Sequence, residues 1–460
     1  MSFQQYLSGL QNKSVAVVGM GISNIPLIEA LISAGVETKV YDKRTEAQLG
    51  DKARMYKQRG VVLYTGDNYL EHLQADVVFR TPGIMPTNPS IVRAVNNGAI
   101  LTSEMEVFFD VCPCRIIGIT GSNGKTTTTS IIAELLRNAG RNVHIGGNIG
   151  RPLLCNADEM NVNDIAVLEL SSFQLVSMKK SPQTAVMTNL SPNHLDVHKD
   201  MDDYFLAKSN IFTHQSDRDT VIFNLDNGYT DEYVKSVKTE NVLYFSSKGV
   251  MQNGVRRSGD SIYFVCGGKD EYLMSVKDVL LPGDHNIENF MAAFLAVRNY
   301  VSFEVMVETA KSFGGVRHRL EFIREHRGIK YFNDSIATNP VRTIAGLKSF
   351  KEKVILIAGG KERGHAYDEL STELLTQVKA LILFGENANS ICDAVQSTIT
   401  RGQQLDIVMC DSMKDAVTSA SDIASSGDIV LFSPASASYD MFNNFEERGE
   451  CFRRTVLELL

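Results

Sequence analysis

Short apolar runs alternate with longer amphipathic segments along the chain. Runs that fit buried strands occur at residues 14–18, 38–41, 75–79, 115–120, 166–170, 186–189, 354–358, 380–384, 407–409 and 429–432. Between many of them, a glycine turn leads into a segment with apolar residues at helical spacing. Strands that alternate with helices predict parallel sheets covered by helices, so we expect an α/β fold.

The alternation falls into three segments, and a chain of 460 residues is long enough for two to four domains. We expect a Rossmann-like domain at residues 1–110 and a central domain with a P-loop ATPase-type parallel sheet at 111–316. A second Rossmann-like domain is expected at 317–460. The stretch Cys112-Pro113-Cys114 is the expected first linker.

Composition limits the functional classes. The net charge of −8 argues against non-specific nucleic-acid binding. Seven scattered cysteines lack the paired spacing of a zinc site and fit reduced thiols. We see neither a signal peptide nor an apolar stretch of about 18 residues, so we expect a cytoplasmic protein without a membrane partner.

The strongest local signal is a phosphate-binding loop at residues 118–126. The segment Gly121-Ser122-Asn123-Gly124-Lys125-Thr126 follows a predicted strand and opens a predicted helix. Glycines let backbone N–H groups converge on phosphate oxygens, and the helix N-terminus adds positive potential. Lys125 is expected to reach the β- and γ-phosphates, and the Thr126 hydroxyl to bind Mg²⁺. The spacing departs from the usual pattern, with five residues between Gly118 and Gly124.

The apolar run at residues 166–170 contains a candidate carboxylate ligand for the expected Mg²⁺. Glu169 stands alone in this apolar strand, where a carboxylate is costly unless it is paired or binds a metal. It is therefore the candidate magnesium ligand. The plain alternative is a glutamate that points to solvent at the strand end.

The N-terminal loop Gly19-Met20-Gly21 admits a dinucleotide interpretation. Asp42 ends the next strand, near where a ribose-binding acid is expected. The third glycine of that fingerprint is replaced by Asn24, so the motif is incomplete and we do not predict NAD. Ser23 is expected to cap the helix that follows.

From the phosphate loop onward, the chain resembles the Mur ligase family. The motifs that carry the resemblance follow in order at residues 118–126, 147–150, 169–174, 193–196, 204–208, 282–289 and 318–319. Residues 333–339, 359–364 and 433–449 resemble the branch of the family that adds D-glutamate. Two positions depart from the pattern, since the family often has lysine where Ile336 stands and aspartate where Glu362 stands.

The resemblance implies an ADP-forming ligase of peptidoglycan precursor synthesis. Such an enzyme adds D-glutamate to UDP-N-acetylmuramoyl-L-alanine through an acyl phosphate. It uses ATP and two Mg²⁺ ions. The resemblance also implies that Lys208 is carbamylated. We expect a monomer without a nucleic-acid partner. The alternatives are a family ligase that adds another amino acid, a ligase that builds folate polyglutamate, and a non-catalytic nucleotide sensor. The motifs with Arg363, Ser438 and Phe445 argue against the first, and the N-terminal domain argues against the second. The set Glu169, His194 and Lys208 argues against the sensor.

The resemblance also implies roles for individual residues. The catalytic set is Lys125, His194 and Lys208, and the metal ligands are Thr126, Glu169, His194 and Lys208. The implied ATP contacts are Gly121, Asn123, Gly124, Lys125, Thr126, Thr127, Asn289, Arg319 and Asp334. The implied contacts of the UDP substrate are Ile22, Ser23, Arg44, Thr81, Gly83, Asn148 and His194. The implied contacts of D-glutamate are Thr338, Arg363, Ser438 and Phe445.

Overall fold

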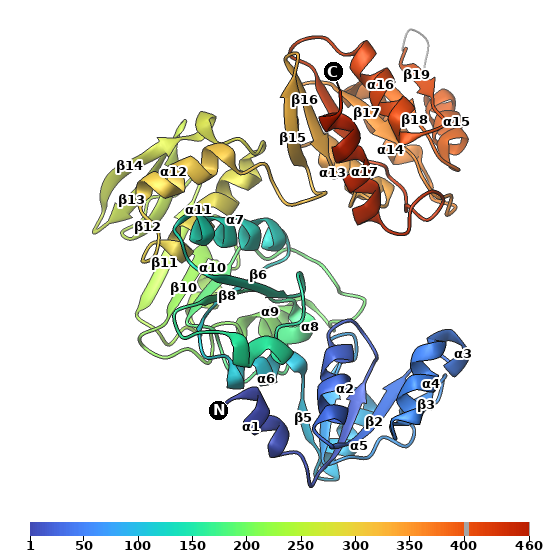
Figure 1. Cartoon of the computed structure of the whole chain (residues 1–460). Coiled ribbons are helices and arrows are strands. Elements are labelled where there is room, and N and C mark those ends of the chain that lie inside the picture. Colours follow the sequence, from blue (N-terminus) through green and yellow to red (C-terminus); the bar gives the residue numbers. More distant parts are fainter. Residues whose placement is uncertain (400–403, 460) are drawn as a thin grey trace. The chain divides into compact units, whose positions relative to one another are not determined.

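A computed structural model describes residues 1–399 and 404–459 (Figure 1). The chain forms two compact units, of which the first comprises Met1–Val276 and Glu288–Thr309 and the second Lys277–Ile287 and Ala310–Leu460. Three sheets built mainly of parallel strands lie within them, two in the first unit and one in the second. The α/β prediction is therefore confirmed.

The N-terminal sheet has five parallel strands in the order β3-β2-β1-β4-β5. Alternate residues of its central strand β1 face opposite sides, with Val15 and Val17 in one apolar cluster and Ala16 and Val18 in another. Burial on both faces explains why this strand is a continuous apolar run. The strands are β1 (Ser14–Val18), β2 (Glu37–Asp42), β3 (Val62–Thr65), β4 (Val77–Arg80) and β5 (Ile100–Thr102). The helices are α1 (Phe3–Ser8), α2 (Asn24–Ser33), α3 (Glu46–Leu49), α4 (Asp51–Gln58), α5 (Pro89–Asn96) and α6 (Glu104–Val111).

The predicted cap of α2 is wrong. The Ser23 side chain makes no capping hydrogen bond, because the Ser23 backbone is already helical (φ −69°, ψ −35°) and a capping residue needs an extended one. The buried Asn24 side chain instead donates to the carbonyls of Val18 (3.2 Å) and Gly19 (2.8 Å). Asn24 thus holds the turn after β1.

The central sheet has nine strands in the order β14-β13-β12-β11-β10-β9-β6-β8-β7. It is parallel from β7 to β12, whereas β12, β13 and β14 pair in antiparallel fashion. The sequence predicted β6, β8 and β9 of this sheet, but not β7 or β10 to β14. Helix α7 packs against β6, β7 and β8 (Figure 1). The strands are β6 (Arg115–Thr120), β7 (Val143–Gly147), β8 (Ile165–Glu169), β9 (Thr184–Met187), β10 (Thr220–Asn224), β11 (Asn241–Ser246), β12 (Gly254–Ser258), β13 (Ser261–Cys266) and β14 (Lys269–Ser275). The helices are α7 (Lys125–Asn138), the 3₁₀ turn η1 (Leu154–Glu159), α8 (Ser172–Leu175), α9 (Met201–Ser209), α10 (Thr230–Val234), the 3₁₀ turn η2 (Val276–Asp278), α11 (Asp284–Val297) and α12 (Phe303–Ser312).

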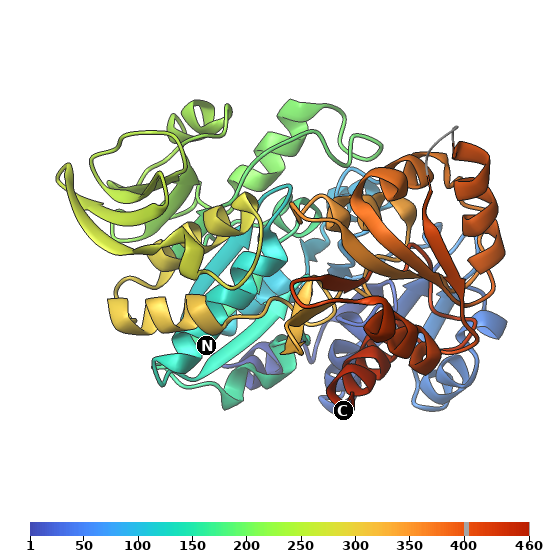
Figure 2. The same cartoon turned by 90° about the horizontal axis from the view of Figure 1, so that it is seen from above.

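The sheet of the second unit has the order β15-β16-β20-β17-β18-β19. Its strands are parallel except that β15, which was not predicted, pairs antiparallel with β16. Apolar residues of α13, α14 and α15 form one core cluster, and those of α16 and α17 form another, so helices cover both faces (Figure 2). The strands are β15 (Glu321–His326), β16 (Ile329–Asn333), β17 (Val354–Ala358), β18 (Val378–Leu383), β19 (Asp406–Met409) and β20 (Ile429–Phe432). The helices are α13 (Pro340–Leu347), α14 (Asp368–Gln377), α15 (Ala388–Thr398), α16 (Met413–Ile423) and α17 (Phe445–Leu457).

The predicted domain boundaries near residues 110 and 316 stay predictions. Among the described residues, no helix is both long and apolar enough to cross a membrane.

Candidate active site

The phosphate loop joins β6 to α7 and depends on two glycines. Gly121 has a φ of 145°, and a Cβ there would lie 2.0 Å from Thr188 Oγ1. Gly124 has a φ of 79°, and a Cβ there would lie 2.4 Å from Asn289 Oδ1. A side chain at either position would be strained and would collide with its neighbour. The close approach of Asn289 also places this residue beside the loop, as its predicted ATP contact requires.

Lys125 is the first residue of α7 and folds back over the loop. Its ammonium donates to the carbonyls of Gly121 (2.9 Å) and Ser122 (3.0 Å). Beside it, Asn189 accepts the backbone N–H of Asn123 at 2.9 Å. The first-turn N–H groups of α7 have no partner within the helix and carry positive potential, so the loop and the lysine form one anion-attracting surface.

Glu169 ends β8 directly beside this loop. Its carboxylate is 2% exposed and accepts the Thr126 hydroxyl at 2.7 Å and the Asn148 side-chain amide at 2.9 Å. Gly147 makes the approach of Asn148 possible, because its φ is 90° and a Cβ there would lie 2.1 Å from the Glu169 carbonyl oxygen. The predicted alternative, a solvated glutamate, is therefore wrong. A buried carboxylate bonded only to neutral donors suits a cation.

A magnesium ion fits these donors in part. Glu169 and Thr126 supply the oxygen ligands that Mg²⁺ prefers, and the remaining positions would be filled by phosphate oxygens and water. Among the residues that the structure describes, no group of three His, Cys, Asp or Glu side chains forms a complete metal site.

Lys208 lies on α9 beneath the same loop and is 1% exposed. Its ammonium donates to the Gly121 carbonyl (2.9 Å) and to Thr120 Oγ1 (3.2 Å), and it lies 4.8 Å from the centre of the Tyr204 ring. Burial, together with the nearby charge of Lys125, holds the pKa of Lys208 well below its ordinary value. The neutral amine is thereby favoured at this position.

His194 stands on the exposed segment after β9 with a φ of 56°. Its ring lies edge-on to Phe173, with 5.1 Å between the ring centres. Partial burial, Lys208 and Lys125 lower its pKa, so the imidazole is neutral near pH 7 and has a lone pair available for a ligand. The low pKa and the position beside the loop suit the predicted role.

The loops predicted to bind the UDP substrate follow β1, β2 and β4, which are neighbours in the N-terminal sheet. Their carboxyl ends therefore meet at one edge, where ligand clefts form in such folds. Gly19 packs against Thr81, since a Cβ on Gly19 would lie 2.9 Å from Thr81 Cγ2. Ile22 is 81% exposed and Gly83 is also exposed, so both are accessible at this edge.

Asp42 and Arg44 form an internal pair in this loop region. The Asp42 carboxylate accepts the Met20 N–H (2.7 Å) and the Arg44 guanidinium (2.9 Å and 2.8 Å). Burial opposes ionisation of Asp42, but these hydrogen bonds from Arg44 and Met20 outweigh it and lower the pKa. The carboxylate is therefore engaged within the loop region and is not presented to a ribose. Half of the Arg44 side chain remains exposed.

The predicted D-glutamate residues follow β16, β20 and β17, which are again neighbours. Thr338 lies after β16, Arg363 after β17, and Ser438 and Phe445 after β20. The buried Arg448 ties two of these loops together by donating to the carbonyls of Ser335 (2.8 Å) and Ala437 (3.0 Å). Parallel topology thus brings all four predicted residues to one edge of the second unit's sheet.

Individual side chains at this edge differ in exposure. Arg363 is exposed and lies 5.5 Å from the ring centre of Tyr439, whereas Ser438 is buried. Glu362 accepts the N–H groups of Arg363 (2.8 Å) and Gly364 (2.7 Å) and so orders the turn. Glutamate therefore serves as the acid of this turn. Nothing in the structure explains the isoleucine at position 336.

Asp334 occupies the centre of this edge. It accepts the Ser433 hydroxyl at 2.8 Å and the Leu320 N–H at 3.2 Å, and burial raises its pKa to about 7. Arg319 is exposed and close enough to lower that pKa slightly. Both belong to the second unit, whereas the phosphate loop belongs to the first, so their shared role in ATP binding stays a prediction.

Comparison with known proteins assigns the family. The chain matches the Mur ligase MurD-like N-terminal domain over residues 13–103, the Mur ligase middle domain over 119–297 and the Mur ligase glutamate ligase domain over 318–436. A UDP-N-acetylmuramoylalanine–D-glutamate ligase from Clostridium novyi (strain NT) is 46% identical over 460 residues, covering 100% of this chain and 99% of the relative. The chain belongs to the Mur ligase family.

Further relatives agree with this assignment. A UDP-N-acetylmuramoylalanine–D-glutamate ligase from Acetivibrio thermocellus is 46% identical over 451 residues, 97% of each chain. The crystal structure of UDP-N-acetylmuramate–alanine ligase from Thermotoga maritima is similar in fold, with a TM-score of 0.54 and 17% identity over 97% of this chain and 99% of that one. A MurF ligase from the same organism, in complex with ADP, has a TM-score of 0.52 at 17% identity, covering 98% and 97%.

This Mur ligase contains a histidine network that sequence reasoning missed. The buried His198 contacts Asp203 (3.0 Å) through Nδ1 and the Ser172 hydroxyl (3.0 Å) through Nε2, and its ring stacks on Phe173. The network joins the start of α8 to α9, the helix that carries Lys208. Residues 194–198 form a turn after β9 and not a helix, so no helical spacing marked His198 in the sequence.

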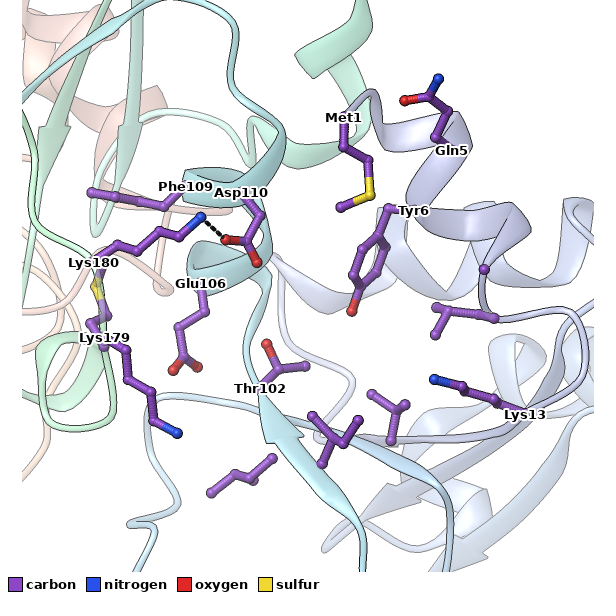
Figure 3. A pocket seen from close by; sticks show the side chains of 16 residues that line it. Met1, Gln5, Tyr6, Lys13, Thr102, Glu106, Phe109, Asp110, Lys179 and Lys180 are labelled. Carbon is purple, nitrogen blue, oxygen red and sulfur yellow. Dashed lines mark ion pairs between the residues drawn. The ribbon is translucent and has the colours of Figure 1, made fainter.

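A separate cavity of about 450 Å³ lies in the first unit, away from the phosphate loop (Figure 3). Apolar residues form part of its wall, and Lys13, Lys179 and Glu106 line it together with the ion pair of Lys180 and Asp110. None of the predicted site residues contributes to it.

Proposed function

We propose that this Mur ligase joins D-glutamate to UDP-N-acetylmuramoyl-L-alanine with ATP, releasing ADP and phosphate. The observation that carries the substrate assignment is the 46% identity along the whole chain to ligases of that name. The site supports the reaction class, since a phosphate loop, a buried carboxylate and two lysines converge at one strand edge.

The phosphoryl transfer would be served by the loop residues. The substrate carboxylate attacks the γ-phosphorus of ATP, the bond between that phosphorus and ADP breaks, and ADP leaves while an acyl phosphate forms. We propose that Lys125 exchanges its two carbonyl partners for phosphate oxygens, while Gly121, Asn123, Gly124 and Thr127 bind the phosphates. The remaining proposed ATP contacts are Thr126, Asn289, Arg319 and Asp334.

The metal would be held by Thr126, Glu169, His194 and Lys208. Two bound Mg²⁺ ions would neutralise charge on the transferring phosphoryl group. Thr126 and Glu169 already contact each other at 2.7 Å, so these two residues are positioned in advance. The neutral imidazole of His194 keeps a lone pair for coordination or for a hydrogen bond.

Carbamylation would give Lys208 an anionic end. A neutral Lys208 amine attacks carbon dioxide, a C–N bond forms, and one proton leaves to solvent. Burial beneath the loop favours the neutral amine that this step requires. The product is a carboxylate-like group, which replaces a repelling ammonium beside Lys125 with a metal ligand.

Amide formation would be served by the second unit. The amine of D-glutamate attacks the acyl phosphate, a tetrahedral intermediate forms, and phosphate leaves. We propose that Arg363 binds a D-glutamate carboxylate and that Thr338, Ser438 and Phe445 line the same site. Ile22, Ser23, Arg44, Thr81 and Gly83 would bind the UDP group, with Asn148 and His194 near the muramoyl-alanine portion.

The wider biological setting is proposed on the same basis. The enzyme acts as a cytoplasmic monomer in peptidoglycan precursor synthesis, with neither a nucleic-acid nor a membrane partner. Its domains are proposed as residues 1–110, 111–316 and 317–460.

An amino-acid panel tests the proposed function. ADP formation is measured with ATP, Mg²⁺ and UDP-N-acetylmuramoyl-L-alanine while D-glutamate, L-glutamate or a diamino acid is supplied. We expect turnover with D-glutamate alone. Equal turnover with L-glutamate would contradict the stereochemical assignment, and ATP binding without turnover of any amino acid would favour a nucleotide sensor.

A further inference from the structure

Two cysteines lie next to each other in the segment between α6 and β6. Cys112 caps the C-terminus of α6, and Cys114 directly precedes β6, with Pro113 between them. The two sulfur atoms are 3.4 Å apart, and Cys112 Sγ also lies 3.6 Å from the Cys114 carbonyl oxygen. The side chains therefore point toward each other within van der Waals contact.

The chain on both sides of the pair is anchored. The Cys112 N–H donates to the Phe108 carbonyl at 2.9 Å, and the Ile116 N–H donates to the Gln183 side chain at 2.8 Å. Pro113 restricts its own φ to about −65° and so limits rotation between the cysteines. A disulfide has an S–S distance of about 2.05 Å. The sulfurs thus need to approach by little more than 1 Å, roughly the scale of side-chain rotation in a short segment.

An oxidant can reach the pair. Cys112 is half-buried and, with Pro113, lines a cavity of about 540 Å³, whereas Cys114 is 6% exposed. Two acids also line this cavity, but Asp158 accepts the N–H groups of Phe3 and Gln4, and Asp110 pairs with Lys180. Their charges are therefore partly neutralised, and Cys112 is the sulfur that reacts first.

The pKa shifts of the two thiols also favour Cys112 as the sulfur that reacts first. The hydrogen bond from the Cys114 thiol lowers the pKa of Cys112, and the same interaction raises the pKa of Cys114. A lowered thiol pKa increases the fraction of reactive thiolate.

We propose that Cys112 and Cys114 are a modification site that forms a reversible disulfide on exposure to a hydroperoxide. The Cys112 thiolate attacks the peroxide O–O bond, giving a Cys112 sulfenic acid, and the departing alkoxide or hydroxide takes a proton from water. The Cys114 sulfur then attacks the Cys112 sulfur, the S–S bond forms, and hydroxide leaves with the Cys114 proton as water. Two thiols are oxidised and one peroxide is reduced, and a dithiol reductant reverses the change.

Peptide mass spectrometry tests this site directly. Trypsin cleaves after Arg93 and after Arg115, and the peptide between them, residues 94–115, contains Cys112 and Cys114 as its two cysteines. The full chain is treated with hydrogen peroxide, denatured, alkylated and digested. We expect this peptide to lose both alkyl groups and to be about 2 Da lighter than the reduced peptide, with both alkyl groups restored by prior dithiothreitol. Its thiols should disappear roughly tenfold faster than that of the exposed Cys266.

Serine variants provide the controls. Cys112→Ser should abolish the 2 Da loss and leave Cys114 alkylated, whereas Cys266→Ser should change nothing. Cys114→Ser should leave Cys112 as a sulfenic acid that dimedone labels. The proposal is overturned if wild-type Cys112 and Cys114 remain fully alkylated at a dose that oxidises Cys266, or if Cys112 proceeds to the sulfinic acid without a disulfide. Equal melting temperatures of the reduced variants check that each one folds.

Discussion

The phosphate-loop site and the carboxyl-end edge of the second unit's sheet differ in how firmly burial and hydrogen bonds fix their side chains. At the loop, Glu169 and Lys208 are 2% and 1% exposed and bonded to neighbouring groups. At the C-terminal edge, Arg363 is exposed beside Tyr439, which is 62% exposed. Under the proposed function, the buried set would stabilise the transition state electrostatically, whereas the exposed arginine would bind a substrate. Substitutions in the first region should therefore lower kcat, and those in the second should raise KM.

The largest effect is expected at Lys125. Lys125→Ala removes a positive charge from the transferring phosphoryl group, so kcat should fall by about 1,000-fold or more. Steady-state ADP formation measures this loss. Arg137→Ala, an exposed arginine at the other end of α7, is the matched control and should retain full activity. A loss of less than tenfold in Lys125→Ala would exclude the lysine from phosphoryl transfer.

Lys208→Ala should lower kcat by roughly 100-fold, because it removes one metal ligand rather than the loop itself. Short-chain carboxylic acids added to this variant should restore part of the activity by occupying the vacated space. Carbon-dioxide-free buffer should also slow the wild-type enzyme. Full activity of Lys208→Ala, or full activity of the wild-type enzyme in carbon-dioxide-free buffer, would contradict the carbamate.

Arg363→Ala should raise the KM for D-glutamate roughly 10- to 100-fold, the range expected for a charge-assisted hydrogen bond to a carboxylate. The KM for ATP should stay within about twofold if the two sites are energetically separate. Arg363→Lys should recover only part of the lost affinity for D-glutamate, because an ammonium cannot make the two parallel hydrogen bonds of a guanidinium. Arg454→Ala, an exposed arginine of the same unit, controls for charge alone. An unchanged KM for D-glutamate in both Arg363 variants would remove this residue from the site.

Two buried acids, Asp334 and Glu104, extend the comparison to the pH dependence of the free energy of unfolding. Burial raises the pKa of Asp334 and of Glu104 to about 7, far above their unfolded values. The folded state then holds protons that the unfolded state releases, so stability should fall as pH rises from about 4 to 7 and stay low above it. At pH 8, Asp334→Asn and Glu104→Gln should each stabilise the protein by roughly 2 kcal/mol.

The two variants should differ in activity. Asp334→Asn should lose activity because Asp334 lies at the predicted nucleotide edge, whereas Glu104→Gln should keep it. Calorimetry at pH 5.5 and pH 8 with parallel assays measures both. If both variants gained stability and kept full activity, Asp334 would be structural.

Sequence reasoning worked best where local chain geometry fixes a residue's place. The glycines at 121 and 124 follow an apolar strand and precede an amphipathic helix, so this succession located the loop and Lys125 although the glycine spacing is unusual. The residues after β16, β17 and β20 were instead assigned through the family resemblance, and the parallel topology is compatible with it because the carboxyl ends of these strands lie together.

The sequence was least informative where distant or half-exposed groups decide the structure. Strand β14 is mostly exposed and reads Lys269-Asp270-Glu271-Tyr272, so no apolar run marks it. The pairing of Asp42 with Arg44 and Met20 closes a loop that looked like a ribose site. His198 was missed because its partners Ser172 and Asp203 come from two different helices.

An oxygen-transfer experiment tests the central claim of acyl-phosphate chemistry most directly. UDP-N-acetylmuramoyl-L-alanine labelled with ¹⁸O in its alanine carboxylate is incubated with ATP, Mg²⁺ and D-glutamate, and the released phosphate is analysed by mass spectrometry. The carboxylate oxygen that attacks the γ-phosphorus leaves with phosphate when the amide forms, so the account predicts one ¹⁸O in each phosphate and one in the amide. Phosphate without ¹⁸O would contradict it.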